Sequence, residues 1–350
     1  MSVRIVIPDD FPPAYAGRPE LEELRKLGEV TLYGDRADTR EELVQRLAGA
    51  DAAINVRAYT RFDEELFAAL PRLKHVAIFG VGTDNFDLDA ATRHGVIVSN
   101  CPGENARSVA ELAIALMLAV ARTIPAYDRD VRAGLWKHYH GIELEGKTLG
   151  VLGLGSIGRH VARMGAGLGM KVVAWSPTRD EARAAALSLT QLELGGVLRQ
   201  ADVLQVCVAL SERTRGLIGE RQFALMKPGA ILVNTARAPI VDEPALIAAL
   251  QSGRLRGAGL DVFASEPLAP DSPLRALENV VLTPHAGWVT TEASARLLIA
   301  PVRNLANWLA GQPTNVVNPA ALARTTDPAP SPNAGGRERG NPLDEGPGTR

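Results

Sequence analysis

TLGVLGLGSIGR, at residues 148–159, combines an apolar strand-forming run with glycines at Gly153, Gly155 and Gly158 and the start of a helix. In such a strand–turn–helix unit the first glycine permits a tight turn. The second lets a pyrophosphate approach the backbone, and the third allows the helix to pack closely. The helix N-terminus offers free N–H groups to an anion. A tight turn without a ligand is the alternative, but the pattern favours a Rossmann domain that binds NAD(H) or NADP(H).

Apolar runs continue outward from this turn and alternate with helical patterns. They are nearly continuous in apolar residues, which is typical of parallel strands covered on both faces. Strands alternating with helices predict a doubly wound α/β sheet. The six runs lie at residues 148–152, 171–175, 203–208, 230–234, 257–262 and 280–282.

A second, N-terminal series of short strands predicts another parallel sheet, of flavodoxin-like type, in a separate substrate domain. A helical pattern at residues 290–309 lies beyond the last strand of the later series, and we expect it to cross back and cover the first sheet. The predicted domains are residues 1–100 with 289–318 for substrate, 101–288 for NAD(P), and a Pro/Gly-rich disordered tail at 319–350. The N-terminal runs lie at residues 3–7, 52–55, 75–79 and 96–98.

Ser108 and Glu111 have the spacing of a capping box at the start of an apolar helix. A helix that is apolar on all sides must be buried on all sides, so we expect it to pack between domains or between subunits.

The chain has 350 residues and a formal net charge of −2, which gives no electrostatic reason to expect a nucleic-acid or membrane partner. The first apolar run is too short for a signal segment, so we expect a cytoplasmic protein. His138 and His140, near Glu143, lack the ligand spacing of a metal site, and no metal is predicted.

The residue that would bond the coenzyme ribose follows the second strand of the Rossmann series. Ser176 stands there, where an acidic residue would select NAD by bonding the ribose 2′-hydroxyl. Arg179 could pair with the 2′-phosphate of NADP, or it could be a solvated loop charge. The coenzyme preference between NAD and NADP stays open on this pattern.

Three functional side chains follow three late strands of this sheet. They are Arg237, Glu266 and His285. Because ligands of open α/β sheets bind beyond the carboxyl ends of the strands, we expect them to converge beside the nicotinamide. Arg237 could hold a carboxylate and polarise an adjacent carbonyl. His285 could give or take a proton, and Glu266 could orient its ring. The chemistry favours hydride transfer at C2 of a small 2-hydroxy or 2-oxo acid.

The chain resembles the D-isomer-specific 2-hydroxyacid dehydrogenase family over about residues 50 to 318, in its phosphoglycerate-dehydrogenase-like branch. The resemblance rests on GVGTDNFD (80–87), NCPGENARSVAE (100–111), LGVLGLGSIGR (149–159), VNTARAPIVDEPAL (233–246), GLDVFASEPL (259–268) and TPHAGWVT (283–290).

The resemblance implies that Arg237, Glu266 and His285 are catalytic. It places the backbone of Val81 and Gly82, and Arg57, at the substrate, and it implies a homodimer formed through the NAD(P)-binding domain. The substrate would be glyoxylate, hydroxypyruvate, a 3-phosphoglycerate-like acid or a relative of these. Many relatives carry Asp where Ser176 stands. The implied coenzyme contacts are Val109, Gly155, Ser156, Ile157, Ser176, Val208, Thr214, Thr235, Ala236, Asp261, His285 and Gly287.

A different class of function also fits this scaffold. Transcriptional corepressors of the same family keep the three catalytic residues, so the alternative is a protein that senses NAD(H) and acts by interaction. Turnover of 2-oxo acids distinguishes an enzyme from a sensor.

Overall fold

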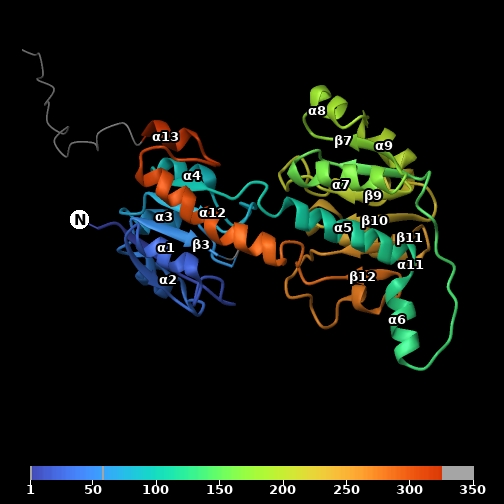
Figure 1. Ribbon diagram of the computed structural model, residues 1–350, viewed down its shortest axis with the longest axis horizontal. Coiled ribbons are helices and arrows are strands. Elements are labelled where there is room, and N and C mark those ends of the chain that lie inside the picture. Colours follow the sequence, from blue (N-terminus) through green and yellow to red (C-terminus); the bar gives the residue numbers. More distant parts are fainter. Residues whose placement is uncertain (1, 57–58, 325–350) are drawn as a thin grey trace, which may run out of the picture.

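The computed structural model describes residues 2–56 and 59–324. Figure 1 shows two lobes, each built on a parallel sheet with helices against it. The prediction of two doubly wound parallel-sheet domains is therefore confirmed, whereas the domain boundaries stay a prediction.

The first lobe holds five parallel strands among the described residues, in the spatial order β2-β1-β3-β4-β5. All four predicted runs are strands, and their side chains form two cores, one on each face of the sheet. The fifth strand, β2, alternates exposed and half-buried residues at the sheet edge and lacks the apolar run of a central strand. The strands are β1 (Arg4–Ile7), β2 (Glu29–Leu32), β3 (Ala52–Asn55), β4 (His75–Ile78) and β5 (Ile97–Ser99).

The first lobe's own helices are α1 (Pro19–Arg25), α2 (Arg40–Leu47), α3 (Glu64–Ala69) and α4 (Leu88–Arg93). They are joined by α12 (Thr291–Leu309), which returns from the second lobe and packs against β4 and α1. Leu297 and Leu305 of α12 are buried in the same core as Ile5 of β1. The helical pattern at 290–309 thus crosses back to the first sheet, as expected.

The second lobe holds seven parallel strands among the described residues, in the order β12-β11-β10-β9-β6-β7-β8. The six predicted runs are all strands, and the two-residue β8 adds an edge that is too short to show in the sequence pattern. The direction of the order changes between β6 and β9, where ligands of doubly wound sheets bind. The strands are β6 (Thr148–Leu152), β7 (Lys171–Trp175), β8 (Thr190–Gln191), β9 (Val203–Val206), β10 (Ala230–Asn234), β11 (Leu255–Leu260) and β12 (Val280–Leu282).

Helices α5 and α7 pack against each other beside this sheet. The second lobe's helices are α5 (Ala106–Ala121), α6 (Ile124–Arg132), α7 (Ser156–Gly167), α8 (Glu181–Ala186), α9 (Leu194–Gln200), α10 (Glu220–Leu225) and α11 (Glu243–Gln251).

Two predictions from the sequence were wrong, one about the start of a helix and one about the start of the disordered tail. The helix predicted to start at a Ser108 capping box begins at Ala106, and the hydroxyl of Ser108 instead donates to the carbonyl of Gly287. Residues 320–324, within the predicted disordered tail, form α13 (Ala320–Arg324), where Ala321 is buried and the helix packs against α4. The rest of the predicted tail, 325–350, lies outside the described residues.

No single helix in the part of the chain that the structure describes is long and apolar enough to cross a bilayer. Taken together, α5 and α6 pass that test by length and composition, although they are bent by 67° at their break. Nine residues of α5 are buried inside the protein, which is typical of a core helix.

Candidate active site

The glycine turn between β6 and α7 has the geometry that a bound dinucleotide requires. Gly153 has a φ of +99°, and a Cβ there would lie 2.9 Å from the backbone of Cys207. A Cβ on Gly158 would lie 1.9 Å from the carbonyl oxygen of Gly153, so only glycine lets the helix pack this closely. At Gly155 an added Cβ meets nothing within 4 Å, which leaves open space before the helix N-terminus. Ser156 and Ile157 begin the first turn of α7, where backbone N–H groups have no carbonyl partner within the helix.

Ser176, directly after β7, lies against the same turn. Its hydroxyl accepts a hydrogen bond from the backbone N–H of Leu154 at 3.1 Å. Arg179 lies in the following loop, where it pairs with Glu181 at 2.5 Å and its guanidinium donates to the carbonyl of Gln191 at 3.5 Å. The structure thus places a neutral side chain where an acidic one would bond the coenzyme ribose.

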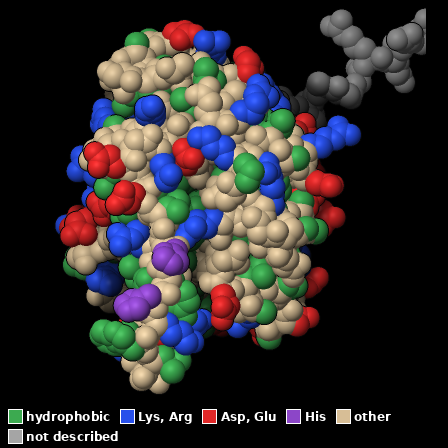
Figure 2. Space-filling model, turned by 90° about the vertical axis from the view of Figure 1, so that its right-hand side faces the viewer, with side chains coloured by type: hydrophobic (Ala, Val, Ile, Leu, Met, Phe, Trp, Pro, Cys, Tyr) green, Lys and Arg blue, Asp and Glu red, His purple; other side chains and the backbone are tan. Residues whose placement is uncertain are grey.

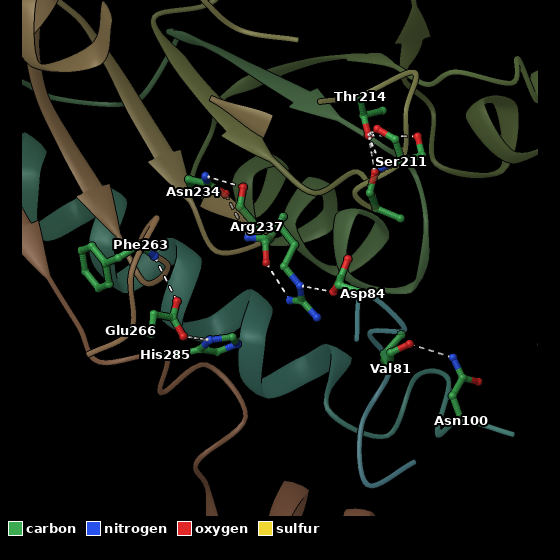
Figure 3. Close-up of polar contacts among 12 residues, drawn as sticks. Val81, Asp84, Asn100, Ser211, Thr214, Asn234, Arg237, Phe263, Glu266 and His285 are labelled. Atoms are coloured by element: carbon green, nitrogen blue, oxygen red, sulfur yellow. Dashed lines mark hydrogen bonds and ion pairs between the residues drawn. The ribbon is translucent and has the colours of Figure 1, made fainter. Parts of the chain in front are cut away.

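His285 and Glu266 form a hydrogen-bonded pair beyond β12 and β11, with 2.8 Å between Nδ1 and Oε2 (Figure 3). The other carboxylate oxygen accepts the backbone N–H of Phe263 at 3.0 Å. Burial alone would raise the pKa of Glu266, but the hydrogen bond and charge of His285, the Phe263 N–H and the charge of Arg237 together lower it. The side chains of His285 and Glu266 are 40% and 37% exposed, so a small molecule can reach them.

The loop that carries His285 is held by Asp261, a buried residue directly after β11. One oxygen of its carboxylate accepts hydrogen bonds from the Thr283 hydroxyl at 2.6 Å and the Ala286 N–H at 2.8 Å. The other accepts the Gly287 N–H at 2.9 Å. His285 itself has a φ of +54°, a left-handed conformation that is rare outside glycine. Asp261 therefore holds a strained backbone in place, a role that the sequence did not indicate.

Arg237 reaches from the second lobe to the first. Its Nε donates to Oδ2 of Asp84 at 2.7 Å, and Asn234 fixes the turn by donating from its side-chain amide to the Arg237 carbonyl at 3.1 Å (Figure 3). Asp84 lies within GVGTDNFD, but no pattern in the sequence singles out this acidic residue. Its partner is 153 positions away along the chain.

The expected substrate loop lies against the same guanidinium. A Cβ on Gly82 would be 1.9 Å from Nη2 of Arg237, so the missing side chain makes room for the arginine. The carbonyl of Val81 accepts a hydrogen bond from Asn100 at 2.8 Å, and Val81 is exposed. The structure therefore brings Val81, Gly82 and Arg237 together, whereas Arg57 lies outside the described residues.

The other predicted coenzyme contacts lie around the carboxyl edge of the second sheet. Thr214 is buried, and its hydroxyl donates to the carbonyl of Ala209 at 2.7 Å, which stabilises the loop after β9. Thr235 and Ala236 lead into Arg237, and the Thr235 hydroxyl accepts a hydrogen bond from Gln205 at 3.3 Å. Val109, Val208 and Gly287 are buried. Among the described residues, no group of three or more His, Cys, Asp or Glu side chains could hold a metal ion.

Comparisons with known proteins show the family to which the chain belongs. Residues 114–287 match the family model of the D-isomer specific 2-hydroxyacid dehydrogenase, NAD binding domain. A glyoxylate reductase of Korarchaeum cryptofilum is 39% identical over 306 residues, 85% of this chain and 92% of that protein. A D-3-phosphoglycerate dehydrogenase of Archaeoglobus fulgidus is 44% identical over 283 residues, 80% of this chain. The match spans only 54% of that dehydrogenase, so the chain covers about half its length.

A solved structure has a similar fold. It is an acyclic imino acid reductase in complex with NADPH and D-Arg, with a TM-score of 0.83 and 30% identity to this chain. The similarity covers 90% of this chain and 100% of that one.

Proposed function

Because the chain belongs to the D-isomer specific 2-hydroxyacid dehydrogenase family, we propose that it is an NAD(P)-dependent oxidoreductase acting on a small D-2-hydroxy acid or 2-oxo acid. The observation that carries the proposal is the His285–Glu266 pair at 2.8 Å, on the sheet edge that also presents Arg237 and the glycine turn. When bound, a reduced nicotinamide would supply the hydride that C2 of the acid receives.

Arg237 is the proposed anchor of the substrate. Its planar guanidinium can hold a carboxylate and polarise the neighbouring carbonyl oxygen. The backbone N–H groups of Val81 and Gly82 lie in the loop against this guanidinium and would bind the same carboxylate. The anchor is therefore assembled from both lobes, which makes its geometry depend on the arrangement of the lobes.

His285 is the proposed acid and base. Reduction of the carbonyl leaves an alkoxide at C2, and an imidazolium can give that oxygen a proton; oxidation of the alcohol reverses this transfer. Because Nδ1 is bonded to Glu266, the other ring nitrogen, Nε2, would carry the transferred proton. Glu266 stays ionised at neutral pH because its pKa lies below the ordinary value, and its carboxylate orients the imidazole ring through the bond to Nδ1.

The test is an activity screen of the purified full-length chain. NADH and NADPH are each mixed with glyoxylate, hydroxypyruvate, phosphohydroxypyruvate and pyruvate, and oxidation of the coenzyme is followed. We expect turnover with at least one pair. Binding of coenzyme without turnover of any acid would contradict the proposal and favour the sensor alternative.

A variant tests the role of the imidazole. His285→Ala should lower kcat by about a hundredfold or more, the usual contribution of a general acid, and leave coenzyme binding largely intact. His138→Ala, at an exposed histidine outside the site, is the matched control and should keep full activity. Equal loss of coenzyme binding in His285→Ala would show a structural role.

We also propose a homodimer formed through the second lobe. At the end of α6 and directly after it, the chain exposes Val131, Leu135 and Trp136, the last with 84% of its surface accessible. Figure 2 views this end of the molecule and shows apolar side chains beside basic ones near two histidines. Exposed apolar surface of this kind supports a protein partner, and a second copy of the chain would cover it.

A further inference from the structure

We infer that the coenzyme is NADP(H), and that Ser176, Arg183 and Arg213 form the site of its 2′-phosphate. The inference rests on the proposed dinucleotide binding and deepens it by naming the coenzyme. It concerns the loop after β7, where the adenosine ribose of a dinucleotide lies in this fold.

Ser176 is adjacent to the glycine turn because β7 pairs with β6. Leu152 and Trp175 are register partners, and the N–H of Gly153 donates to the carbonyl of Trp175 at 2.6 Å. A site selective for NAD places a carboxylate directly after this strand, where it would repel a phosphate. Here the residue is an uncharged serine whose hydroxyl already accepts the Leu154 N–H at 3.1 Å. Nothing at this position opposes a phosphate dianion.

Two guanidinium groups from different elements each donate a hydrogen bond to a backbone carbonyl near Ser176. Arg183, from α8, donates to the carbonyl of Leu154 at 3.3 Å. Arg213, from the loop after β9, donates to the carbonyl of Pro177 at 3.1 Å. Both hydrogen bonds use one end of a guanidinium that has five donors, so further N–H groups remain for an anion. A fork of this kind binds phosphate oxygens in pairs.

In the part of the chain that the structure describes, the ion pairs around the loop leave one arginine, Arg213, without an acidic partner. Asp180 caps α8 and pairs with Nε of Arg183 at 3.2 Å, and Glu181 pairs with Arg179 at 2.5 Å. Arg213 has no carboxylate partner within 4.0 Å among the described residues, and the neighbouring exposed Glu212 makes no ion pair there. A phosphate monoester carries about two negative charges near neutral pH, so it would supply the missing partner.

The test is a binding titration of the full-length chain with NADPH and with NADH, without any 2-oxo acid. Protein fluorescence reports both dissociation constants. We expect NADPH to bind about tenfold more tightly than NADH, or better, because hydrogen bonds to charged groups contribute this much. Equal binding, or tighter binding of NADH, would overturn the inference.

Variants locate the phosphate site. Arg213→Ala and Arg183→Ala should each weaken NADPH about tenfold and change NADH by less than about twofold. Ser176→Asp should reverse the preference by placing a carboxylate at the ribose. Arg221→Ala, at an exposed arginine of α10, is the control and should change neither constant.

The two coenzymes also separate distortion of the loop from loss of a phosphate contact. If Arg213→Ala or Arg183→Ala weakens NADH as much as NADPH, the arginine supports the loop and the inference fails. Turnover of a 2-oxo acid with NADH alone would refute this inference but leave the proposed function intact. Tighter binding of NADPH without turnover of any 2-oxo acid would support this inference and contradict the proposed function.

Discussion

Substitution of Gly158 by alanine tests how closely α7 must approach β6. The new Cβ would lie 1.9 Å from the carbonyl oxygen of Gly153, 3.0 Å from its carbonyl carbon and 3.3 Å from a methyl of Val151. Two of these atoms belong to the backbone, so no side-chain rotation relieves the contact. The first turn of α7 must retreat by roughly an ångström, and overpacking of this size costs about 1–3 kcal/mol of unfolding free energy. Urea unfolding followed by circular dichroism measures this loss.

Gly155→Ala is the matched control, because the same methyl group there meets nothing within 4 Å. The residue is the N-cap of α7 with a φ of −69°, which alanine adopts freely. We expect less than about 1 kcal/mol of lost stability, the difference between these residues at an N-cap. Coenzyme affinity should fall more than tenfold, roughly, because the methyl occupies the approach of the diphosphate. Wild-type stability in Gly158→Ala, or wild-type coenzyme binding in Gly155→Ala, would refute the account of the turn.

Three further outcomes follow from the site. Gly82→Ala should raise KM for the 2-oxo acid about tenfold at unchanged stability, because its Cβ displaces the flexible end of Arg237. Steady-state kinetics measure KM and urea midpoints measure stability, and an unchanged KM would contradict the prediction. Because folding lowers the pKa of Glu266, its contribution to stability is full above the ordinary carboxyl pKa and is lost as the pH falls through the lowered value. Urea midpoints in that acid range should therefore fall more steeply for the wild type than for Glu266→Gln, and parallel curves would count against it. Trp136→Ser should convert a dimer to a monomer in light scattering after size-exclusion chromatography, whereas a monomeric wild type would remove the proposed interface.

The architecture could be predicted from the sequence because central parallel strands are apolar on both faces. AILVN, at β10, is buried along its whole length, and so is β3. The edge strands β2 and β8 lack this signal, since one is half exposed and the other has two residues. The start of α5 was misplaced because Ser108 has capping spacing, yet its hydroxyl bonds a carbonyl that lies 179 residues away.

The proposed catalytic residues could be predicted from the sequence, whereas the residues that hold them in place could not. His285, Glu266 and Arg237 each follow a recognisable strand, so topology places them at one edge. Asp84 and Asp261 act through partners that only the folded chain brings near, and a carboxylate in a loop has no pattern that marks such a role. Long-range pairing of this kind is a property of the tertiary structure.

The chain passes between the lobes twice, at residues 100–105 and 283–290, and the second passage contains His285. Because these two segments connect the lobes, the relative motion that distorts them least is a rotation about the line that joins them. A twist about another axis would deform both segments. Bending would then change the backbone at the strained histidine and move Arg237 away from Asp84 in one event. We therefore expect the open molecule to bind and release its ligands without catalysing the reaction. The reacting groups would align only when the two lobes close.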